Sequence, residues 1–232
     1  MQTSEISWQQ SEVCQSIKVA SILVVLMGLS ACQTIYEEAP APVGITSSGF
    51  TAPAPGTKLS YRTYIGTGSV KQEDWVVITP EQNFKNPAYA LKSGARMVVR
   101  YKHNGNWHAT FTGSEKIKSA TPDDGQMRHP LWVGKKWMST HVYNDFQADR
   151  EWSPIQSFWS VEARETITVE AGTFQVFRLK SDPGLHNSIS STVWFSPKLG
   201  LEIKRKWERL EDHYLGSQKG RVELVKFSSP AA

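Results

Sequence analysis

Short β-prone runs, separated by turn residues, are the feature that most constrains this chain. From Lys58 onward, runs rich in Tyr, Thr, Val, Ile and Trp are interrupted at close intervals by Gly, Pro, Asn or Asp. No window of helical periodicity extends beyond about ten residues there. In the run 165–169, Ile167 and Val169 fall on one face and the two threonines on the other, as in a half-buried strand. Consecutive short strands with tight turns favour an antiparallel meander over βαβ units.

We therefore predict an all-β domain with about nine or ten strands. A single sheet of that size should curl, so a strongly curved antiparallel meander sheet or an open barrel is expected. The region 88–92 is predicted as a helical turn, and Ser119–Pro130 as a loop. The expected strands are 58–65, 74–79, 96–102, 107–112, 135–146, 155–170, 173–181, 189–195, 201–210 and 221–227.

Residues Ile17–Cys32 have the order of parts of a bacterial export signal. Lys18 precedes an apolar run that is shorter than the roughly 20 residues needed to span a bilayer. The run ends in Leu29-Ser30-Ala31-Cys32, which resembles the lipobox of bacterial lipoproteins. The resemblance implies cleavage before Cys32, a diacylglyceryl thioether on its sulfur and acylation of its new amine, for example by palmitate.

Several acyl chains on one residue would hold the protein stably to a membrane. Gln33 follows the cysteine, and the resemblance implies outer-membrane sorting because Asp at that position retains enterobacterial lipoproteins in the inner membrane. The alternative is a secreted protein that is cleaved at another small residue and keeps Cys32 as a free thiol.

The composition changes along the chain and suggests four parts. Pro40, Pro42, Pro53 and Pro55 stand among small residues without a hydrophobic period, which is typical of a flexible spacer. The expected parts are a signal peptide 1–31, a lipidated cysteine with a Pro/Gly-rich tether 32–56, an antiparallel β-domain 57–228 and a tail 229–232.

Charge and cysteine content limit the partners and the chemistry. The formal net charge of +4 is a mild excess and does not indicate a nucleic-acid partner. In an envelope, the anionic partners for such a domain are lipid head groups, lipopolysaccharide or an acidic glycan, and ordinary solubilising charge is the alternative. Cys14 lies in the expected signal and Cys32 is the expected lipid site, so the β-domain has no disulfide and no thiol nucleophile.

Common catalytic and metal motifs are missing from the sequence. G-x-S-x-G, H-E-x-x-H and C-x-x-C do not occur. Asn104-Gly105 predicts a two-residue hairpin turn, which would pair residue 103 with 106 and keep His103 and His108 from sharing a metal. Asp124 and His129 could form an acid–histidine pair, with solvated loop residues as the alternative. We expect no catalytic residue, metal ion or cofactor.

Tryptophans are the first group of candidate binding residues. Eight of the nine tryptophans follow Cys32. Indole faces stack on sugars and line lipid-facing grooves, whereas core packing and cross-strand pairing are the alternative. Trp132 and Trp152 lie nearest to predicted loops, so we expect them to be the more exposed and to contact a ligand.

The second candidate group is the basic run Lys204, Arg205 and Lys206 on the expected strand 201–210. Alternation places Lys204 and Lys206 with Glu202 on one face, and Arg205 on the other. The run could meet anionic head groups or a glycan. A solvated outer face that also discourages edge pairing is the alternative.

Three segments of the β-domain look like those of a group of uncharacterised bacterial periplasmic and lipoprotein β-domains. They are Pro130–Trp137, Val169–Phe174 and Trp194–Pro197. The group implies no particular chemistry. The architecture is also similar in kind to carrier lipoproteins that cradle acyl chains in a half-barrel, which is an analogy of fold and does not fix function.

These observations favour a non-enzymatic outer-membrane lipoprotein that binds an envelope lipid or glycan, or docks on an envelope protein partner. A structural or assembly-accessory lipoprotein without a small ligand is the second hypothesis. An envelope hydrolase with a non-standard site is the third, and it requires His129, an acid and a hydroxyl to meet in one cleft.

Overall fold

The structure is a computed structural model, and it describes residues 41–44 and 48–230. The expected signal peptide, Cys32 and Gln33 lie outside these residues. Strands and connecting turns make up the described chain. The strands are β1 (Lys58–Ile65), β2 (Ser69–Ile78), β3 (Ala88–Ser93), β4 (Arg96–Tyr101), β5 (Trp107–Thr112), β6 (Glu115–Thr121), β7 (Lys136–Asp145), β8 (Arg150–Val169), β9 (Gly172–Pro183), β10 (Ile189–Ser196), β11 (Leu201–Arg209) and β12 (Gln218–Ser228).

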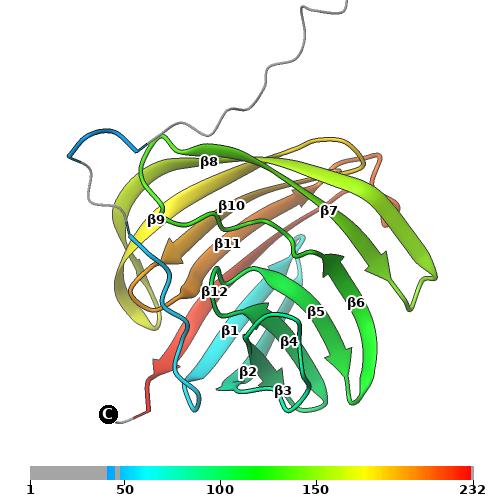
Figure 1. Cartoon of the computed structure of the whole chain (residues 1–232), viewed down its shortest axis with the longest axis horizontal. Coiled ribbons are helices and arrows are strands. Elements are labelled where there is room, and N and C mark those ends of the chain that lie inside the picture. The colour runs from blue at the N-terminus through cyan, green and yellow to red at the C-terminus, as the bar shows by residue number, and fades with distance from the viewer. Residues whose placement is uncertain (1–40, 45–47, 231–232) are drawn as a thin grey trace, which may run out of the picture. The chain divides into compact units, whose positions relative to one another are not determined.

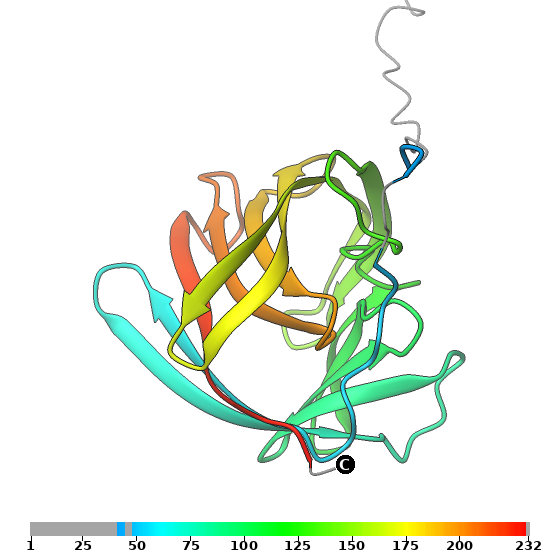
Figure 2. The ribbon, with the colours of Figure 1, turned by 90° about the vertical axis from the view of Figure 1, so that its left-hand side faces the viewer.

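Each strand pairs with its neighbours in sequence, and β1 also pairs with β12, which closes the sheet into a barrel (Figures 1 and 2). The closing pair extends from Lys58↔Ser228 to Ile65↔Gly220 and is antiparallel like all the others. Closure removes the two exposed edges that an open meander would leave. The predicted all-β antiparallel meander is therefore confirmed, and it forms a closed barrel. No helix long and apolar enough to cross a bilayer occurs in the described part of the chain.

Two of the strands were not predicted from the sequence. We expected a helical turn at 88–92, but this segment is β3, which pairs with both β2 and β4. Its composition, Ala-Tyr-Ala-Leu-Lys, suits a helix, and pairing on both sides overrides that local preference. β6 begins with charged residues and extends to Thr121, so the predicted loop from Ser119 starts later than expected. Pairing with β5 and β7 supplies the hydrogen bonds that this polar segment needs.

The turn between β4 and β5 is wider than the predicted two-residue hairpin. The Tyr101 N–H donates to the Asn106 carbonyl at 3.1 Å, and the Gly105 N–H donates to the Tyr101 carbonyl at 2.8 Å. Gly105 has a φ of +76°. The Asn104 side chain accepts the Asn106 N–H at 2.9 Å and donates to Asp123 at 3.0 Å. Asn104 therefore acts through side-chain hydrogen bonds, including one to a distant loop that the local motif did not reveal.

One end of the barrel is covered by the segment that precedes β1. The Phe50 ring lies 6.4 Å from Tyr89, 5.2 Å from His129 and 6.3 Å from Phe195, measured between centroids. Gly200 approaches the same segment so closely that a Cβ there would lie 2.0 Å from the Thr51 carbonyl oxygen. The last part of the predicted flexible tether thus packs against the barrel. We call this the closed end.

Three clusters of buried apolar side chains fill much of the barrel wall. The first is centred on Trp137 and Trp159, whose rings stack with centroids 6.2 Å apart. The second includes Leu59, Ile203 and Leu224, and Phe50 packs against both of these clusters. The third is formed by side chains of β3, β4 and β5. Four of the eight tryptophans that follow Cys32 belong to these clusters or pack against them, as in the alternative to ligand binding: Trp75, Trp137, Trp159 and Trp194.

Candidate functional site

A cavity of about 860 Å³ opens at the end of the barrel opposite Phe50. We call this end the mouth, because the turns β7–β8, β9–β10 and β11–β12 meet there. The lining is rich in aromatic and polar side chains. The aromatic members are Trp107, Tyr143, Trp152, Trp159, Trp207 and Tyr214, and the polar members include His141, Asn187, Ser191, Arg205, Arg209 and Asp212.

Three of the aromatic side chains form a continuous row. The Trp152 ring lies 5.6 Å from Tyr143 and 5.0 Å from Tyr214, between centroids. Trp152 and Tyr143 are cross-strand partners on β8 and β7, just beyond a register shift at His141. Tyr214 comes from the β11–β12 turn, and its hydroxyl donates to Asp145 at 3.4 Å. Strands and turn together thus hold a partly exposed aromatic surface, which we call the aromatic row.

Trp207 is a further aromatic residue of the lining. Its cross-strand partner on β12 is Gly220. A Cβ at Gly220 would lie 2.3 Å from the indole Cζ2, so the indole rests directly on the β12 backbone. The Arg209 guanidinium lies 5.6 Å from the centroid of the same indole. Glycine at position 220 is therefore what allows this ring to lie flat.

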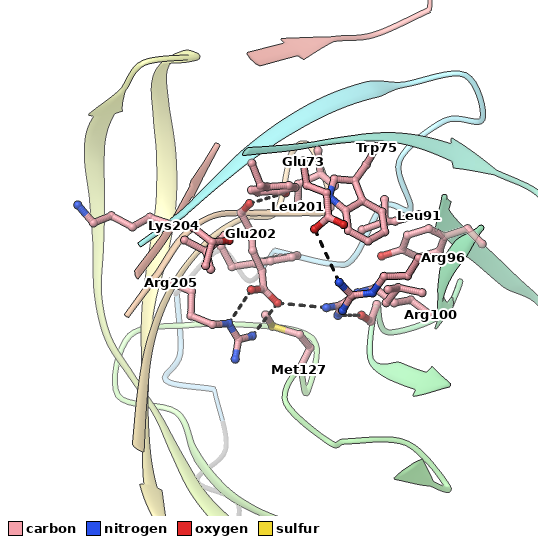
Figure 3. Close-up of a pocket in the computed structure, with 18 residues that line it drawn as sticks. Glu73, Trp75, Leu91, Arg96, Arg100, Met127, Leu201, Glu202, Lys204 and Arg205 are labelled. Carbon is pink, nitrogen blue, oxygen red and sulfur yellow. Dashed lines mark hydrogen bonds and ion pairs between the residues drawn. The ribbon is translucent and has the colours of Figure 1, made fainter. Parts of the chain in front are cut away.

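A charged network occupies the barrel interior below the mouth (Figure 3). Glu202 accepts hydrogen bonds from Arg205 Nη2 at 2.8 Å and from Gln126 Nε2 at 2.9 Å. Arg100 Nη2 lies 3.4 Å from the same carboxylate, and Arg100 Nη1 donates to the Gly105 carbonyl at 2.8 Å. The network borders an inner chamber of about 260 Å³, and Arg205 lines both this chamber and the mouth.

A β-bulge brings Glu202 and Arg205 together. Trp194 and Phe195 of β10 face Lys204 and Glu202 of β11, which leaves Ile203 as an extra residue. Such a residue breaks the strict alternation of a strand. The prediction that Glu202 and Arg205 lie on opposite faces is therefore wrong.

The interior shifts the pKa of two carboxyl groups in opposite directions. Burial opposes ionisation of Glu202, but Arg205 and Arg100 outweigh it and lower the pKa of Glu202 to about 2. Burial raises the pKa of Asp124 to about 6, although Arg100 acts against this shift. Glu202 is thus a fixed anion between two guanidinium groups, whereas Asp124 gains a proton in mildly acidic solution.

Two of the five residues predicted as ligand-binding, Trp152 and Arg205, line the mouth together. Trp132 does not, and only 6% of its surface is exposed. The Lys135 ammonium lies 4.3 Å from the centroid of its ring and donates to the Arg128 carbonyl at 2.7 Å. The connection between β6 and β7 folds back on the barrel, so the prediction that Trp132 is exposed is wrong.

Lys204 and Lys206 lie apart from the mouth. Their ammonium groups are 5.5 Å and 6.0 Å from the centroid of Trp194. Lys204 also pairs with Glu223 at 2.7 Å, and Figure 3 shows its side chain extending away from Glu202. Because Arg205 faces the interior, the three residues of the basic run do not form one surface.

Sequence reasoning did not single out Trp207, Arg209 and Tyr214. A pattern in the sequence could have identified Trp207 and Arg209, because they follow Arg205 at every second position of β11. All three residues line the mouth. Tyr214 lies in a turn without periodicity, and only its contact with Trp152 identifies it.

Asp124 and His129 do not form the acid–histidine pair considered from the sequence. His129 Nδ1 lies 3.5 Å from the Ser48 carbonyl oxygen, its Nε2 is buried without a hydrogen-bond partner, and burial lowers its pKa to about 4. Asp124 instead accepts the Trp107 N–H at 3.1 Å and the Gln126 N–H at 3.3 Å. The cleft required for the hydrolase hypothesis is therefore not built around His129.

The other histidines considered from the sequence stack on one aromatic ring. His103 and His108 lie 5.6 Å and 4.8 Å from Tyr101, between ring centroids. Among residues 41–44 and 48–230, no group of three or more His, Cys, Asp or Glu side chains is placed to hold a metal ion.

Comparison with protein-family models gave no match to this chain, and comparison with curated proteins gave none. Solved structures show a likeness of fold. The hypothetical lipoprotein YmcC from Escherichia coli is 14% identical, with 97% of this chain and 100% of that chain covered and a TM-score of 0.42.

Two further solved structures have a similar level of likeness. A protein named as a lipoprotein from Parabacteroides distasonis is 12% identical, with 79% of this chain and 100% of that chain covered and a TM-score of 0.37. One named as an exported protein with a YmcC-like fold, from Bacteroides fragilis, is 10% identical, with coverage of 78% and 100% and a TM-score of 0.36. At these identities and TM-scores the likeness supports no conclusion about the site or the function of this chain.

Proposed function

We propose that this protein is a lipid-anchored envelope lipoprotein whose barrel mouth binds the saccharide part of an envelope glycan or glycolipid. The observation that carries the proposal is the open cavity of about 860 Å³, in which aromatic faces and polar groups converge. A cavity of this size lies within the usual range of roughly 300–1,000 Å³ for ligand sites.

The chemistry of the lining favours a saccharide over a purely apolar ligand. The aromatic row offers flat faces against which the C–H side of a sugar ring can stack. The same lining presents hydroxyl, amide and guanidinium groups, which match the hydroxyls of a sugar. A ligand enters from the mouth because Phe50 and its neighbours cover the closed end.

The location part of the proposal rests on the sequence. The lipobox-like ending Leu29-Ser30-Ala31-Cys32 supports a thioether-linked lipid anchor, and Gln33 supports sorting to the outer membrane. Two or more acyl chains on Cys32 are sufficient for stable attachment.

The proposal is tested by titrating the mature protein in detergent with delipidated oligosaccharides released from bacterial envelopes, while intrinsic tryptophan fluorescence is followed. A saturable change is expected, and Trp152→Ala should weaken binding at least tenfold, or by about 1.4 kcal/mol. Trp194→Ala is the matched control, because Trp194 lies beside Lys204 and Lys206 and does not line the mouth.

Two results would count against a saccharide site. One is the absence of any saturable change, and the other is equal loss of affinity in the two variants. If crosslinking in native membranes then returned a protein partner at the mouth, the assembly-accessory role would be favoured instead.

A further inference from the structure

We infer that the saccharide bound at the mouth is an acidic one, and that Arg209 pairs with its carboxylate. This inference deepens the proposed function and rests on it. It depends on which of the positively charged side chains in the mouth already have a carboxylate partner. These side chains are Arg96, Lys118, Arg205 and Arg209.

Three of these cations already have carboxylate partners. Arg96 lies 3.7 Å from Glu73, and Lys118 lies 3.3 Å from Asp145. Arg205 lies 2.8 Å from Glu202, within the interior network. Each of these three cations therefore has a carboxylate of the protein within ion-pair distance.

Arg209 differs from the other three, because no carboxylate pairs with it in the described part of the chain. Its Nη2 donates to the amide oxygen of Gln218, which is neutral. Its Nε is buried without a hydrogen-bond partner. Asp212 also lines the mouth but is exposed to water and forms no ion pair with Arg209. Arg209 thus lines the mouth with a positive charge that no carboxylate of the described residues pairs with.

The geometry around Arg209 suits a carboxylated sugar. Its guanidinium lies over the indole of Trp207, with 5.6 Å from Arg209 Cζ to the ring centroid. The charge is therefore held against an aromatic ring in the lining of the mouth. A guanidinium presents its donors in a planar fork that matches a carboxylate. The attraction is stronger in a cavity than on an open surface, because less water screens it. A sugar ring that stacks in the mouth can thus place a carboxylate on Arg209.

A second polar atom in the mouth lacks a partner. His141 is 9% exposed, and its Nδ1 is buried without a hydrogen bond. Burial lowers the pKa of His141, which favours the neutral ring, so His141 adds polarity and not charge to the lining of the mouth. The mouth is therefore a polar site as well as an aromatic one, and Arg209 supplies the charge without a carboxylate partner.

The test compares matched acidic and neutral saccharides on the mature protein in detergent. Suitable pairs are tetragalacturonate with galactotetraose, sialyllactose with lactose, and a glucuronate-terminated with a glucose-terminated oligosaccharide. Calorimetric titration at low and at physiological salt should give at least tenfold tighter binding for the acidic member of the pairs that bind. The preference should shrink as salt rises, since salt screens the charge pair.

Variants separate the role of Arg209 from general effects. Arg209→Gln should abolish the preference for the acidic members, with the larger loss of affinity on the acidic side, since it removes the charge pair. Arg209→Lys should retain part of the preference, because it keeps the charge without the fork. Lys206→Gln is the control, as it removes a cation from the same strand that does not line the mouth.

Equal affinity for acidic and neutral members would overturn the inference and leave the proposed function standing. An unchanged preference in Arg209→Gln, including one in which both members lose affinity equally, would overturn the role of Arg209. If no saccharide of any kind bound to the protein, the proposed function itself would fail.

Discussion

Arg100 of β4 and Glu202 of β11 meet inside the barrel, with 3.4 Å between Nη2 and Oε1, although these strands are not neighbours in the sheet. Arg205 and Gln126 bind the same carboxylate. This network lies between the closed end, where Phe50 packs, and the open mouth. The network borders the inner chamber and, through Arg205, also the mouth.

The first prediction concerns this network. Glu202→Gln leaves Arg100 and Arg205 without their anion in a site where the glutamate is only 18% exposed. Removing one member of a buried ion pair destabilises a protein by about 3–5 kcal/mol, so we expect the free energy of unfolding to fall by about 3 kcal/mol. Urea denaturation at pH 7 measures it. Glu208→Gln is the control, since its pair with Lys219 is exposed and should contribute less than about 1 kcal/mol. Equal effects in the two variants would contradict the prediction.

The second prediction is a pH dependence that originates at Asp124. Burial raises the pKa of Asp124 from 3.8 to about 6, so the folded protein holds this proton more tightly than the unfolded chain. The contribution of Asp124 to stability is therefore fully present below about pH 4 and is lost as the pH rises to about 6.

Asp124→Asn removes this dependence and keeps an oxygen that accepts the Trp107 and Gln126 N–H groups. We expect the variant to be more stable than the parent by roughly 1–2 kcal/mol at pH 8 and equally stable near pH 4. Urea midpoints at the two pH values measure the difference. A variant that is less stable at pH 8 would show that the ionised carboxylate is favoured by its surroundings.

The third prediction concerns the closed end. Phe50→Ala removes a ring that packs against two core clusters, and because the ring is only partly buried we expect a loss of about 2 kcal/mol. Binding at the mouth should stay within twofold, since Phe50 lies at the other end. Thermal denaturation and saccharide titration measure the two effects. Val43→Ala is the control, because that side chain is fully exposed. A gain of ligand access or affinity in Phe50→Ala would show that the two ends communicate.

The fourth prediction concerns the lipid anchor. Cys32→Ser removes the sulfur that the lipobox resemblance assigns to a thioether, so the protein should carry no lipid and should lose the lipid-dependent processing and membrane partition of the parent. Fractionation and intact mass measure this, with Cys14→Ser as the control. Partition and mature mass that are unchanged in Cys32→Ser would mean that the protein is attached to the membrane by other means.

Local sequence signals determined the fold class. The alternation at Ile167 and Val169 and the turn near Ala171 predicted a hairpin, and β8 and β9 pair there from Val169↔Gly172 onward. Such signals depend only on the period of a pleated strand and on the few residues that fit a tight turn. They did not detect β3, because its composition suits a helix and only pairing on both sides makes it a strand.

The candidate site was predicted only in part. Trp152 and Arg205 were expected to contact a ligand, and both line the mouth. Trp132 was expected to be exposed as well, but the β6–β7 connection buries it beneath Lys135. Proximity to a predicted loop does not determine exposure, because the path of a long loop depends on what it packs against.

The sequence by itself therefore determined a chain of antiparallel strands, because the strand pattern is a property of neighbouring residues, and it predicts an export signal on the same local grounds. Only the tertiary structure decided which side chains meet inside the barrel. The extra residue Ile203 turns Glu202 toward Arg205, and closure of the sheet brings Arg100 to the same carboxylate. Register and closure are set by pairings between distant strands, and no short stretch of sequence encodes them alone.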